Sequence, residues 1–388
     1  MILALALFAL LAWLWLLLAQ GGFWRAGERL PPAPPPDRWP EVAILIPARN
    51  EAASIGPVVA AHLASTYPGP LRLFLVDDGS TDGTAAIARE AAGGIDPRFT
   101  LVSAPPLPAG WSGKLWALQA AVAEARRAMP EARWFLLTDA DILHGPDLLA
   151  RLVAAGEAEG LALVSVMARL DARGVWGGLL IPAFLYFFQM LYPFPRVNNP
   201  ESRVAGAAGG VVLIRRDALE GIGGLAAIRG ALIDDCTLAA RVKAGPPRRA
   251  IRLVLADAMA PATSLRDNRA YAGIRDMVAR TAFTQLSFSA LKLAGTVIGL
   301  ALVFVAPPVI ALTPALHGDE VAALLAALAW AIMAFTFAPT LRYMERRAWP
   351  AILLPLAALL YGWFTLLSAL RHWAGRGGQW KGRSYPAG

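Results

Sequence analysis

The chain has 388 residues, of which 57% are hydrophobic and only 16% are charged, and its net charge is +8. Soluble domains carry about 25% charged residues, so this composition excludes a disordered chain and a simple soluble enzyme and indicates that much of the chain lies in a membrane. The single cysteine excludes a disulfide framework, and four scattered histidines without an H-x-x-x-H pair argue against a zinc hydrolase. The basic residues form no contiguous stripe, so we expect no nucleic-acid partner.

The N-terminal residues 1–20 are predicted to form a transmembrane signal-anchor. Met1–Ala19 carries no charged side chain and is long enough to span a bilayer. Because arginines follow this stretch and none precedes it, the positive-inside rule places the N-terminus outside and the next domain in the cytosol. Residues 21–40 contain a run of prolines, and we expect this linker to act as a stiff spacer that holds the next domain off the bilayer.

The C-terminal part is predicted to be a transmembrane region, residues 286–371, followed by a basic tail, residues 372–388. If all of its apolar stretches cross the bilayer, the basic tail lies outside, against the positive-inside rule. The basic tail lies inside only if one of these stretches does not cross the bilayer, so we expect two or three transmembrane helices. The protein is expected to be a multi-pass protein of a bacterial-type inner (cell) membrane. The apolar stretches, each near the ~20 residues of a spanning helix, are Phe288–Thr313, Val321–Leu341 and Trp349–Leu370.

Residues 41–285 are predicted to form one α/β domain with a mostly parallel sheet, because short apolar runs alternate with helical patterns. Within it, residues 175–194 are apolar and aromatic but contain prolines, and we interpret them as an amphipathic or re-entrant segment in the membrane interface. The predicted strands are Val42–Pro47, Leu71–Val76, Phe99–Val102, Trp134–Thr138 and Leu161–Val166. The predicted helices are Ser54–Ala64, Asp82–Ala92, Lys114–Ala128, Pro146–Ala155 and Cys236–Lys243.

Polar residues follow three of these strands. Because ligands of parallel sheets bind beyond the carboxyl ends of the strands, these residues should meet at one edge. Turn and helix-cap chemistry explains each group alone, but five carboxylates at three strand ends repel one another unless a cation binds. Asp139 and Asp141, on alternate residues, suit a divalent cation that takes its other ligands from water and phosphates. The residues are Pro47, Arg49 and Glu51, then Asp77 and Asp78, then Asp139 and Asp141.

Further groups could act at the same edge. Lys114 follows a glycine-flexed helix start that favours anionic groups, although the segment fails the P-loop pattern and a solvated lysine is an equally good interpretation. Asp234 and Asp235 begin a predicted helix and act either as partners of its dipole or as a general base. Arg280 contacts either lipid headgroups or a diphosphate. The small residues 206–210 permit close approach of a ligand or tight backbone packing.

As a set, these motifs resemble family 2 glycosyltransferases with the GT-A fold over the whole middle block. Finer details are similar to the hopanoid-biosynthesis-associated branch and, more distantly, to ceramide glucosyltransferases. The family-wide motifs are Pro47–Glu51, Asp77–Thr84, Gly113–Lys114, Asp139–Asp141 and Asp234–Asp235. The branch-like motifs are Gly110–Lys114, Val197–Pro200, Leu232–Cys236 and Met277–Thr281.

The resemblance implies a role for each site residue. Glu51 and Asp78 would hold the nucleobase and ribose, and Asp235 would be the catalytic base. The metal would be Mg or Mn. The implied nucleotide-sugar-binding residues are Pro47, Arg49, Glu51, Asp77, Asp78, Lys114 and Asp139, the metal ligands are Asp139 and Asp141, and the catalytic residues are Asp234, Asp235 and Arg280.

One departure from the family pattern limits the expected reaction. Processive relatives carry a Gln-x-x-Arg-Trp motif that helps to hold a growing polymer. Here Met277 stands at the Gln position and Thr281 at the Trp position, so only Arg280 remains. The resemblance therefore implies transfer of a single sugar.

The expected function is an inverting, membrane-bound hexosyltransferase. It would move a sugar from a nucleotide sugar, most simply a UDP-hexose, to a lipid acceptor such as a hopanoid or a similar lipid alcohol. Two alternatives stay open. The acceptor could be a polyprenyl phosphate, which needs no base, or the chain could be a catalytically silent membrane scaffold that keeps a nucleotide site.

Overall fold

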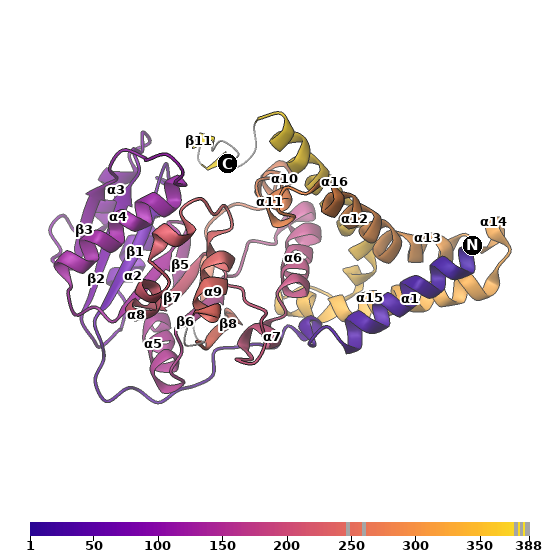
Figure 1. The fold of residues 1–388 in the computed structure, drawn as a ribbon, viewed down its shortest axis with the longest axis horizontal. Coiled ribbons are helices and arrows are strands. Elements are labelled where there is room, and N and C mark those ends of the chain that lie inside the picture. Colours follow the sequence, from indigo (N-terminus) through magenta and orange to yellow (C-terminus); the bar gives the residue numbers. More distant parts are fainter. Residues whose placement is uncertain (246–248, 258–260, 376–378, 381–382, 385–388) are drawn as a thin grey trace.

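The structure is a computed structural model that describes residues 1–245, 249–257, 261–375, 379–380 and 383–384. Figure 1 shows an α/β part at one end and an elongated helical bundle at the other, with the N-terminus at the far tip of the bundle. Much of the predicted basic tail, including Lys381, lies outside the described residues. A short two-stranded ladder, β10 (Gln379–Trp380) with β11 (Arg383–Ser384), is described within it.

The α/β part contains a seven-stranded sheet in the order β3-β2-β1-β4-β7-β6-β8. All neighbours pair in parallel except β7, which is antiparallel to both β4 and β6. The predicted α/β class with a mostly parallel sheet is thus confirmed. The strands are β1 (Val42–Ala48), β2 (Leu71–Asp77), β3 (Phe99–Ser103), β4 (Trp134–Thr138), β6 (Leu163–Met167), β7 (Val211–Arg215) and β8 (Ile251–Leu255).

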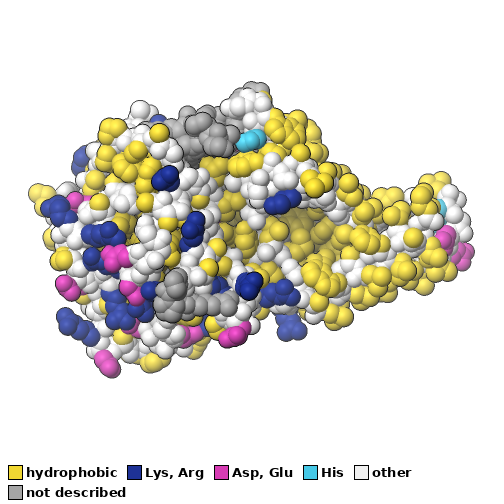
Figure 2. All heavy atoms as spheres, in the orientation of Figure 1, with side chains coloured by type: hydrophobic (Ala, Val, Ile, Leu, Met, Phe, Trp, Pro, Cys, Tyr) yellow, Lys and Arg dark blue, Asp and Glu magenta, His cyan; other side chains and the backbone are white. Residues whose placement is uncertain are grey.

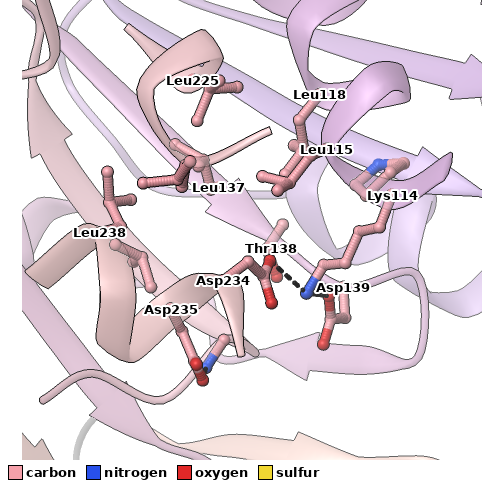
Figure 3. Close-up of a pocket in the computed structure, with 14 residues that line it drawn as sticks. Lys114, Leu115, Leu118, Leu137, Thr138, Asp139, Leu225, Asp234, Asp235 and Leu238 are labelled. Atoms are coloured by element: carbon pink, nitrogen blue, oxygen red, sulfur yellow. Dashed lines mark hydrogen bonds and ion pairs between the residues drawn. The ribbon is translucent and has the colours of Figure 1, made fainter. Parts of the chain in front are cut away.

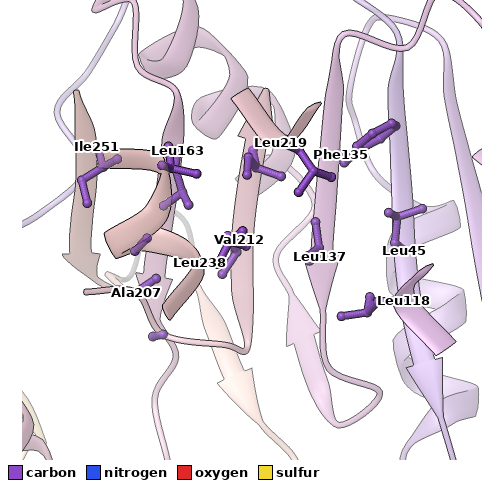
Figure 4. Close-up of a cluster of buried hydrophobic side chains, with 14 of the residues drawn as sticks. Leu45, Leu118, Phe135, Leu137, Leu163, Ala207, Val212, Leu219, Leu238 and Ile251 are labelled. Atoms are coloured by element: carbon purple, nitrogen blue, oxygen red, sulfur yellow. The ribbon is translucent and has the colours of Figure 1, made fainter. Parts of the chain in front are cut away.

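Helices cover both faces of this sheet, which is why its central strands are continuous apolar runs. On one face, Leu115 and Leu118 of α4 pack against Leu45 and Phe135 (Figure 4). On the other face, α2, α3 and α5 pack against the alternate side chains of the same strands. The helices of this part are α2 (Ile55–Leu63), α3 (Thr84–Ala91), α4 (Gly113–Ala128), α5 (Leu148–Ala158), α7 (Phe194–Asn198), α8 (Arg216–Gly221) and α9 (Asp234–Ala244).

Sequence patterns did not predict every element. The strand β7 follows the small residues 206–210 and is antiparallel to its neighbours. The alternation of strands and helices in the sequence therefore did not predict it. A second, two-stranded sheet of β5 (Ile142–His144) and β9 (Ala262–Ser264) joins residues that are 120 positions apart. Strands of three residues are too short to produce a periodic signal.

The first residues of the proline-rich linker contact the α/β part, and its role as a spacer from the bilayer stays a prediction. The backbone N–H of Leu255 in β8 donates to the carbonyl of Glu28 (2.9 Å), and Leu30 is buried. The side chain of Asn198 bonds both Glu28 and the backbone of β8. The linker therefore lies along the edge of the α/β part, and its prolines cost no sheet hydrogen bonds there because the segment ends at an edge.

Lys243 fixes the loop that returns from the bundle to the sheet. Its buried Nζ donates to the carbonyls of Val197 (2.6 Å), Asn199 (3.0 Å) and Val204 (2.7 Å). A buried ammonium is tolerated only where its donors are satisfied. This side chain therefore holds residues 196–204 in place from the back of α9.

The bundle contains long apolar helices that could cross a membrane by length and composition. The N-terminal helix α1 packs along α15, and α13 packs beside both. A π-helical turn, Ala301–Val305, separates α12 from α13, where the following prolines lack backbone donors. The elements are α1 (Ile2–Leu18), η1 (Phe23–Arg25), α12 (Ala290–Leu300), α13 (Ala306–Leu312), α14 (Pro314–His317), α15 (Glu320–Tyr343), η4 (Trp349–Leu353) and α16 (Leu354–Trp373).

The segment predicted to lie in the interface forms α6 (Gly174–Leu191), with Pro182 inside it. Tyr186 bonds Thr336 of α15 (2.8 Å), and Tyr361 of α16 donates to the Leu180 carbonyl (2.9 Å). Figure 1 shows α6 between the α/β part and the bundle, drawn across the direction of α1 and α15, with α10 (Tyr271–Ala279) and α11 (Ala282–Gln285) near it. Its length alone would allow it to span, so its place in the interface stays a prediction.

The last apolar stretch turns back on itself. It starts beside the middle of α15, where the Trp330 indole donates to the Ile352 carbonyl (3.1 Å). It ends at the α/β side, where Arg371 pairs with Asp276 of α10 (2.7 Å). The loop before it lies at that side too, because the Tyr343 hydroxyl donates to the Ala256 carbonyl. The loop before this stretch and its C-terminal end thus both lie at the α/β side, while its start lies at mid-bundle, an arrangement in which the stretch need not cross a bilayer.

We expect Lys243→Met to lower the free energy of unfolding by about 3 kcal/mol, because several buried carbonyls lose a charged donor. Thermal unfolding in detergent measures this loss. The matched control is Arg241→Met, an exposed cation on the same helix, which should leave the unfolding temperature nearly unchanged. Equal effects of the two substitutions would show that Lys243 does not hold the loop.

Cysteine labelling tests the path of α16. The native Cys236 is buried and is replaced by alanine in the background. In spheroplasts, an impermeant maleimide should label Ala315→Cys in α14 without permeabilisation and Ala374→Cys, after α16, only with it. Labelling of both positions from outside would mean that α16 crosses the bilayer.

Candidate active site

The carboxyl ends of β1, β2 and β4 lie at one edge of the sheet, as their parallel register requires. Ala48 pairs with Asp77, so the residues after β1 and β2 are neighbours. Arg49 Nη1 lies 3.5 Å from Asp78 Oδ2, and Arg49 also donates to the Asp78 carbonyl. Asp78 is only 3% exposed, so this buried carboxylate depends on the guanidinium beside it.

The loops after β1 and β2 are bonded to each other. The backbone N–H of Asn50 donates to Ser80 Oγ (2.9 Å), and that of Thr81 donates to Asn50 Oδ1 (2.9 Å). The N–H of Glu51 donates to Thr84 Oγ1 (2.8 Å). Asn50 adopts the left-handed conformation (φ 53°), which asparagine tolerates better than most residues. These bonds hold Glu51 next to the Arg49–Asp78 pair.

Asp77 has a local structural role in the same loop. Its Oδ1 accepts the backbone N–H of Ser80 (3.2 Å), which is turn chemistry. The turn-forming interpretation is therefore correct for Asp77 in this structure. Its neighbour Asp78, in contrast, pairs with the guanidinium of Arg49.

The second cluster of charged residues has Lys114 at its centre (Figure 3). Lys114 Nζ lies 2.9 Å from Asp139 Oδ1 and 3.2 Å from Asp234 Oδ2. Burial lowers the pKa of Lys114, but the two aspartates outweigh burial, so the pKa rises and the side chain stays protonated. Lys114 is held in place because Ser112 caps α4, its hydroxyl accepting the N–H of Leu115. One ammonium thus joins a strand-end acid to a helix-start acid.

Asp235 differs from its neighbour Asp234. Its two carboxylate oxygens accept the backbone N–H groups of Gly209 (2.7 Å) and Cys236 (2.7 Å). Burial and then the charge of Asp234 raise the pKa of Asp235, Lys114 and the two N–H groups lower it, and the net result is a pKa of about 6. A carboxylate with this pKa is mostly ionised at neutral pH but is a stronger base than an exposed aspartate.

The glycine-rich segment before β7 approaches this carboxylate closely. A Cβ atom on Gly209 would lie 3.1 Å from Asp235 Oδ2 and 3.4 Å from Lys114 Nζ. A side chain here would displace the charged groups of the cluster. Of the two interpretations of residues 206–210, close packing of backbone against the site residues is the one seen at Gly209.

Asp141 and Arg280 extend the cluster, together with a residue that the sequence analysis missed. Arg266 Nη2 lies 3.2 Å from Asp141 Oδ2. Burial and Asp139 raise the pKa of Asp141, whereas Arg266 lowers it. Arg280, an exposed side chain at the end of α10, lies close enough to Arg266 and the cluster acids for their charges to act on it. Arg266 follows the short strand β9, which no sequence pattern announced.

Asp139 and Asp141 fit a divalent cation. Across the parts of the chain that the structure describes, no three His, Cys, Asp or Glu side chains converge to enclose a metal unaided. Mg²⁺ is commonly held by one or two carboxylates together with water and substrate phosphates. The mutual repulsion that raises the pKa of Asp141 would be relieved by such a cation.

Comparisons with known proteins agree with this architecture. Residues 43–223 match the family described as Glycosyl transferase family 2. Over 137 residues, 34% of this chain and 30% of the relative, the sequence is 31% identical to an N-acetylglucosaminyltransferase of Mesorhizobium japonicum. Over 126 residues, 32% of this chain and 35% of the relative, it is 32% identical to a dodecaprenyl-phosphate galacturonate synthase of Rhizobium johnstonii. The match thus covers about a third of the length of these curated relatives.

A solved structure is similar over nearly the whole chain. It is a mannosyltransferase from Pyrobaculum calidifontis in complex with GDP-Man and Mn²⁺, with a TM-score of 0.58 over 96% of this chain and 99% of that one. The sequence identity is 20%, so the similarity concerns the fold. The family match shows that residues 43–223 form a family 2 glycosyltransferase domain, and the solved structure shows that this α/β part has the GT-A fold.

Proposed function

We propose that this enzyme transfers a single sugar from a nucleotide sugar, most simply a UDP-hexose, to the hydroxyl group of a membrane lipid. The observation that carries the proposal is Asp235, a partly buried carboxylate with a raised pKa beside the cationic cluster that would face a diphosphate. The long apolar helices support a lipid acceptor, because they would keep the catalytic part at a membrane surface.

The donor would lie across the edge formed by the ends of β1, β2 and β4. Glu51 and Asp78 would contact the nucleobase and ribose, with Arg49 holding the Asp78 carboxylate in place. Pro47 would line the same edge, and Asp77 would support the loop. Asp139 and Lys114 would lie at the diphosphate, where the ammonium contributes positive charge.

Asp139 and Asp141 would hold Mg or Mn at the same diphosphate. When bound, such a cation offsets the negative charge that develops on the leaving group. Arg266 and Arg280 supply positive charge next to these acids. Dependence of the transfer on a metal is part of this proposal, and its support is the closeness of the Asp139 and Asp141 carboxylates.

The reaction follows from the position of Asp235. Its carboxylate takes the proton of the acceptor hydroxyl, and the oxygen attacks the anomeric carbon from the face opposite the diphosphate. The bond from that carbon to the diphosphate oxygen breaks, and the nucleoside diphosphate leaves with its electron pair. Lys114 and Arg280 stabilise that charge, while Asp234, bonded to Lys114, positions the ammonium. The sugar is transferred with inversion.

The membrane arrangement is part of the same proposal. The catalytic part would face the cytosol of a bacterial-type cell, with α1, α12–α13 and α15 crossing the inner membrane and α16 entering and leaving on the cytosolic side. The far tip, residues 312–320, contains Asp319 and Glu320 but no lysine or arginine, as the positive-inside rule requires outside. The absence of the Gln and Trp of processive relatives, at Met277 and Thr281, supports transfer of one sugar.

A polyprenyl phosphate acceptor is a second candidate. It is favoured by the similarity to the dodecaprenyl-phosphate galacturonate synthase of Rhizobium johnstonii. A phosphate oxygen is already ionised and needs no base, so the two candidates differ in what they require of Asp235. A hopanoid polyol is the alcohol acceptor that we propose first.

Asp235→Asn should reduce transfer to a lipid alcohol by about 10³-fold, because the general base is lost, and should leave the Kd of UDP nearly unchanged. Transfer is measured with radiolabelled nucleotide sugars and lipid extract, and UDP binding by calorimetry. Asp37→Asn, an exposed acid of the linker, is the matched control and should retain full activity. Retained turnover in Asp235→Asn would remove the base from the mechanism and would favour the phosphate acceptor.

The rate of transfer should depend on pH through Asp235. Because the base acts in its ionised form, kcat/KM should be constant at neutral pH and fall as the pH drops through about 6, the pKa of the partly buried carboxyl. A pH–rate profile with the Kd of UDP measured at each pH separates this loss from weaker donor binding. A profile that stays flat down to pH 5 would contradict the assignment.

A further inference from the structure

We infer that Tyr192 and Gln285 form the subsite for the acceptor hydroxyl, and that this uncharged pair selects an alcohol over a phosphate. The inference rests on the proposed transfer to a lipid. It concerns two residues to which neither the sequence motifs nor the comparisons assign a role.

Tyr192 lies directly beside the catalytic base. It is the residue that follows α6, and its ring packs against Gly206, where a Cβ atom would lie 3.0 Å from the ring. The same small-residue segment continues to Gly209, whose N–H bonds Asp235. Cys236 and Asp235 are both close enough to act electrostatically on the Tyr192 hydroxyl. Tyr192 and the base are thus held against the same short segment, residues 206–209.

Gln285 meets Tyr192 from the bundle. It is exposed at the end of α11, and the Tyr192 hydroxyl lies 3.0 Å from its Oε1 and 2.8 Å from its Nε2. The helix α11 is held against α16, because the N–H of Phe283 donates to Ser368 Oγ (3.0 Å). The pair thus bridges the last turn of α6 and a helix fixed to the membrane bundle.

Apolar side chains surround this polar pair. Leu191, the neighbour of Tyr192, is 54% exposed, and Phe288, three residues after Gln285, is 43% exposed. On the face seen in Figure 2, the bundle surface is mainly hydrophobic, whereas Lys and Arg lie on the α/β part and where the two parts meet. A lipid could therefore reach the pair from the bilayer along an apolar surface, with its polar end arriving next to Asp235.

Because neither residue of the pair is charged, the pair favours an uncharged acceptor group. A tyrosine hydroxyl and a carboxamide both donate and accept hydrogen bonds, as an alcohol does. A phosphate would require cations at this point. Of the basic side chains on the described helices around the pair, Arg275 and Arg371 bond Asp276, Lys292 bonds Ser287, and Arg280 lies with the acids of the donor site. The geometry thus favours a neutral hydroxyl that replaces the Tyr192–Gln285 hydrogen bond and is oriented toward Asp235.

The test uses the full-length enzyme in detergent–lipid micelles, with a hopanoid polyol or undecaprenyl phosphate as acceptor. Tyr192→Phe keeps the ring on Gly206 but removes the hydroxyl, and Gln285→Leu removes the amide. Each should raise the KM for the polyol about tenfold, the effect of one lost hydrogen bond, while the Kd of UDP and the unfolding temperature stay unchanged. The double variant should be little worse than either single one, because both residues hold one group.

Lys292→Met is the control. It should leave polyol transfer unchanged, whereas a phosphate-binding site would lose activity with it. The inference is overturned if the variants lower kcat or UDP affinity while the polyol KM stays the same, or if the wild-type enzyme uses only undecaprenyl phosphate and depends on Lys292. If the wild-type enzyme labels no lipid from any donor, the proposed function itself fails, which is a different outcome from unaffected variants.

Discussion

The contact of Lys114 with Asp139 and Asp234 is the interaction on which the site depends. The fold brings acids from a strand end and a helix start to one place, and without positive charge their repulsion would oppose the assembly. A single ammonium stabilises both, at the start of α4. Arg266 does the same for Asp141. The cations that hold the acids together are also the groups that a diphosphate would contact, so site stability and donor affinity have one electrostatic origin.

The second constraint is the junction between the α/β part and the bundle. The helix α6 packs on α15 and α16 through buried hydroxyl contacts, and Tyr343 ties the end of α15 to the strand side. Asp276 binds Arg371 at the end of α16. These contacts come from distant segments, so the catalytic part is fixed to the bundle and does not hang from the linker. The base proposed at Asp235 would then act only on acceptors presented at one depth.

The sheet and donor loops could be predicted because their signals are local. Apolar runs bounded by turn-forming residues predicted β1 to β4 and the helices between them. The acids that follow three of these strands predicted the cluster around Asp139. Arg266, Tyr192 and Gln285 could not be predicted, because each reaches the site through contacts between segments that lie far apart in the sequence. The course of the linker could not be predicted for a related reason: its prolines indicate stiffness, but tertiary contacts at Glu28 and Leu30 decide where the segment lies.

The turn of α16 connects these observations. Because the loop before α16 and the C-terminal end of α16 both lie at the α/β side, the arginines of residues 342–347 and Arg371 lie there too, and Ser368 of α16 also anchors α11 and with it Gln285. A helix that crossed the bilayer would carry its C-terminal end to the far tip and leave α11 without this support. The same fold-back that satisfies the charge rule thus builds one wall of the proposed acceptor subsite. A polar lipid headgroup and a water-soluble donor can then meet at Asp235 without either leaving its own phase.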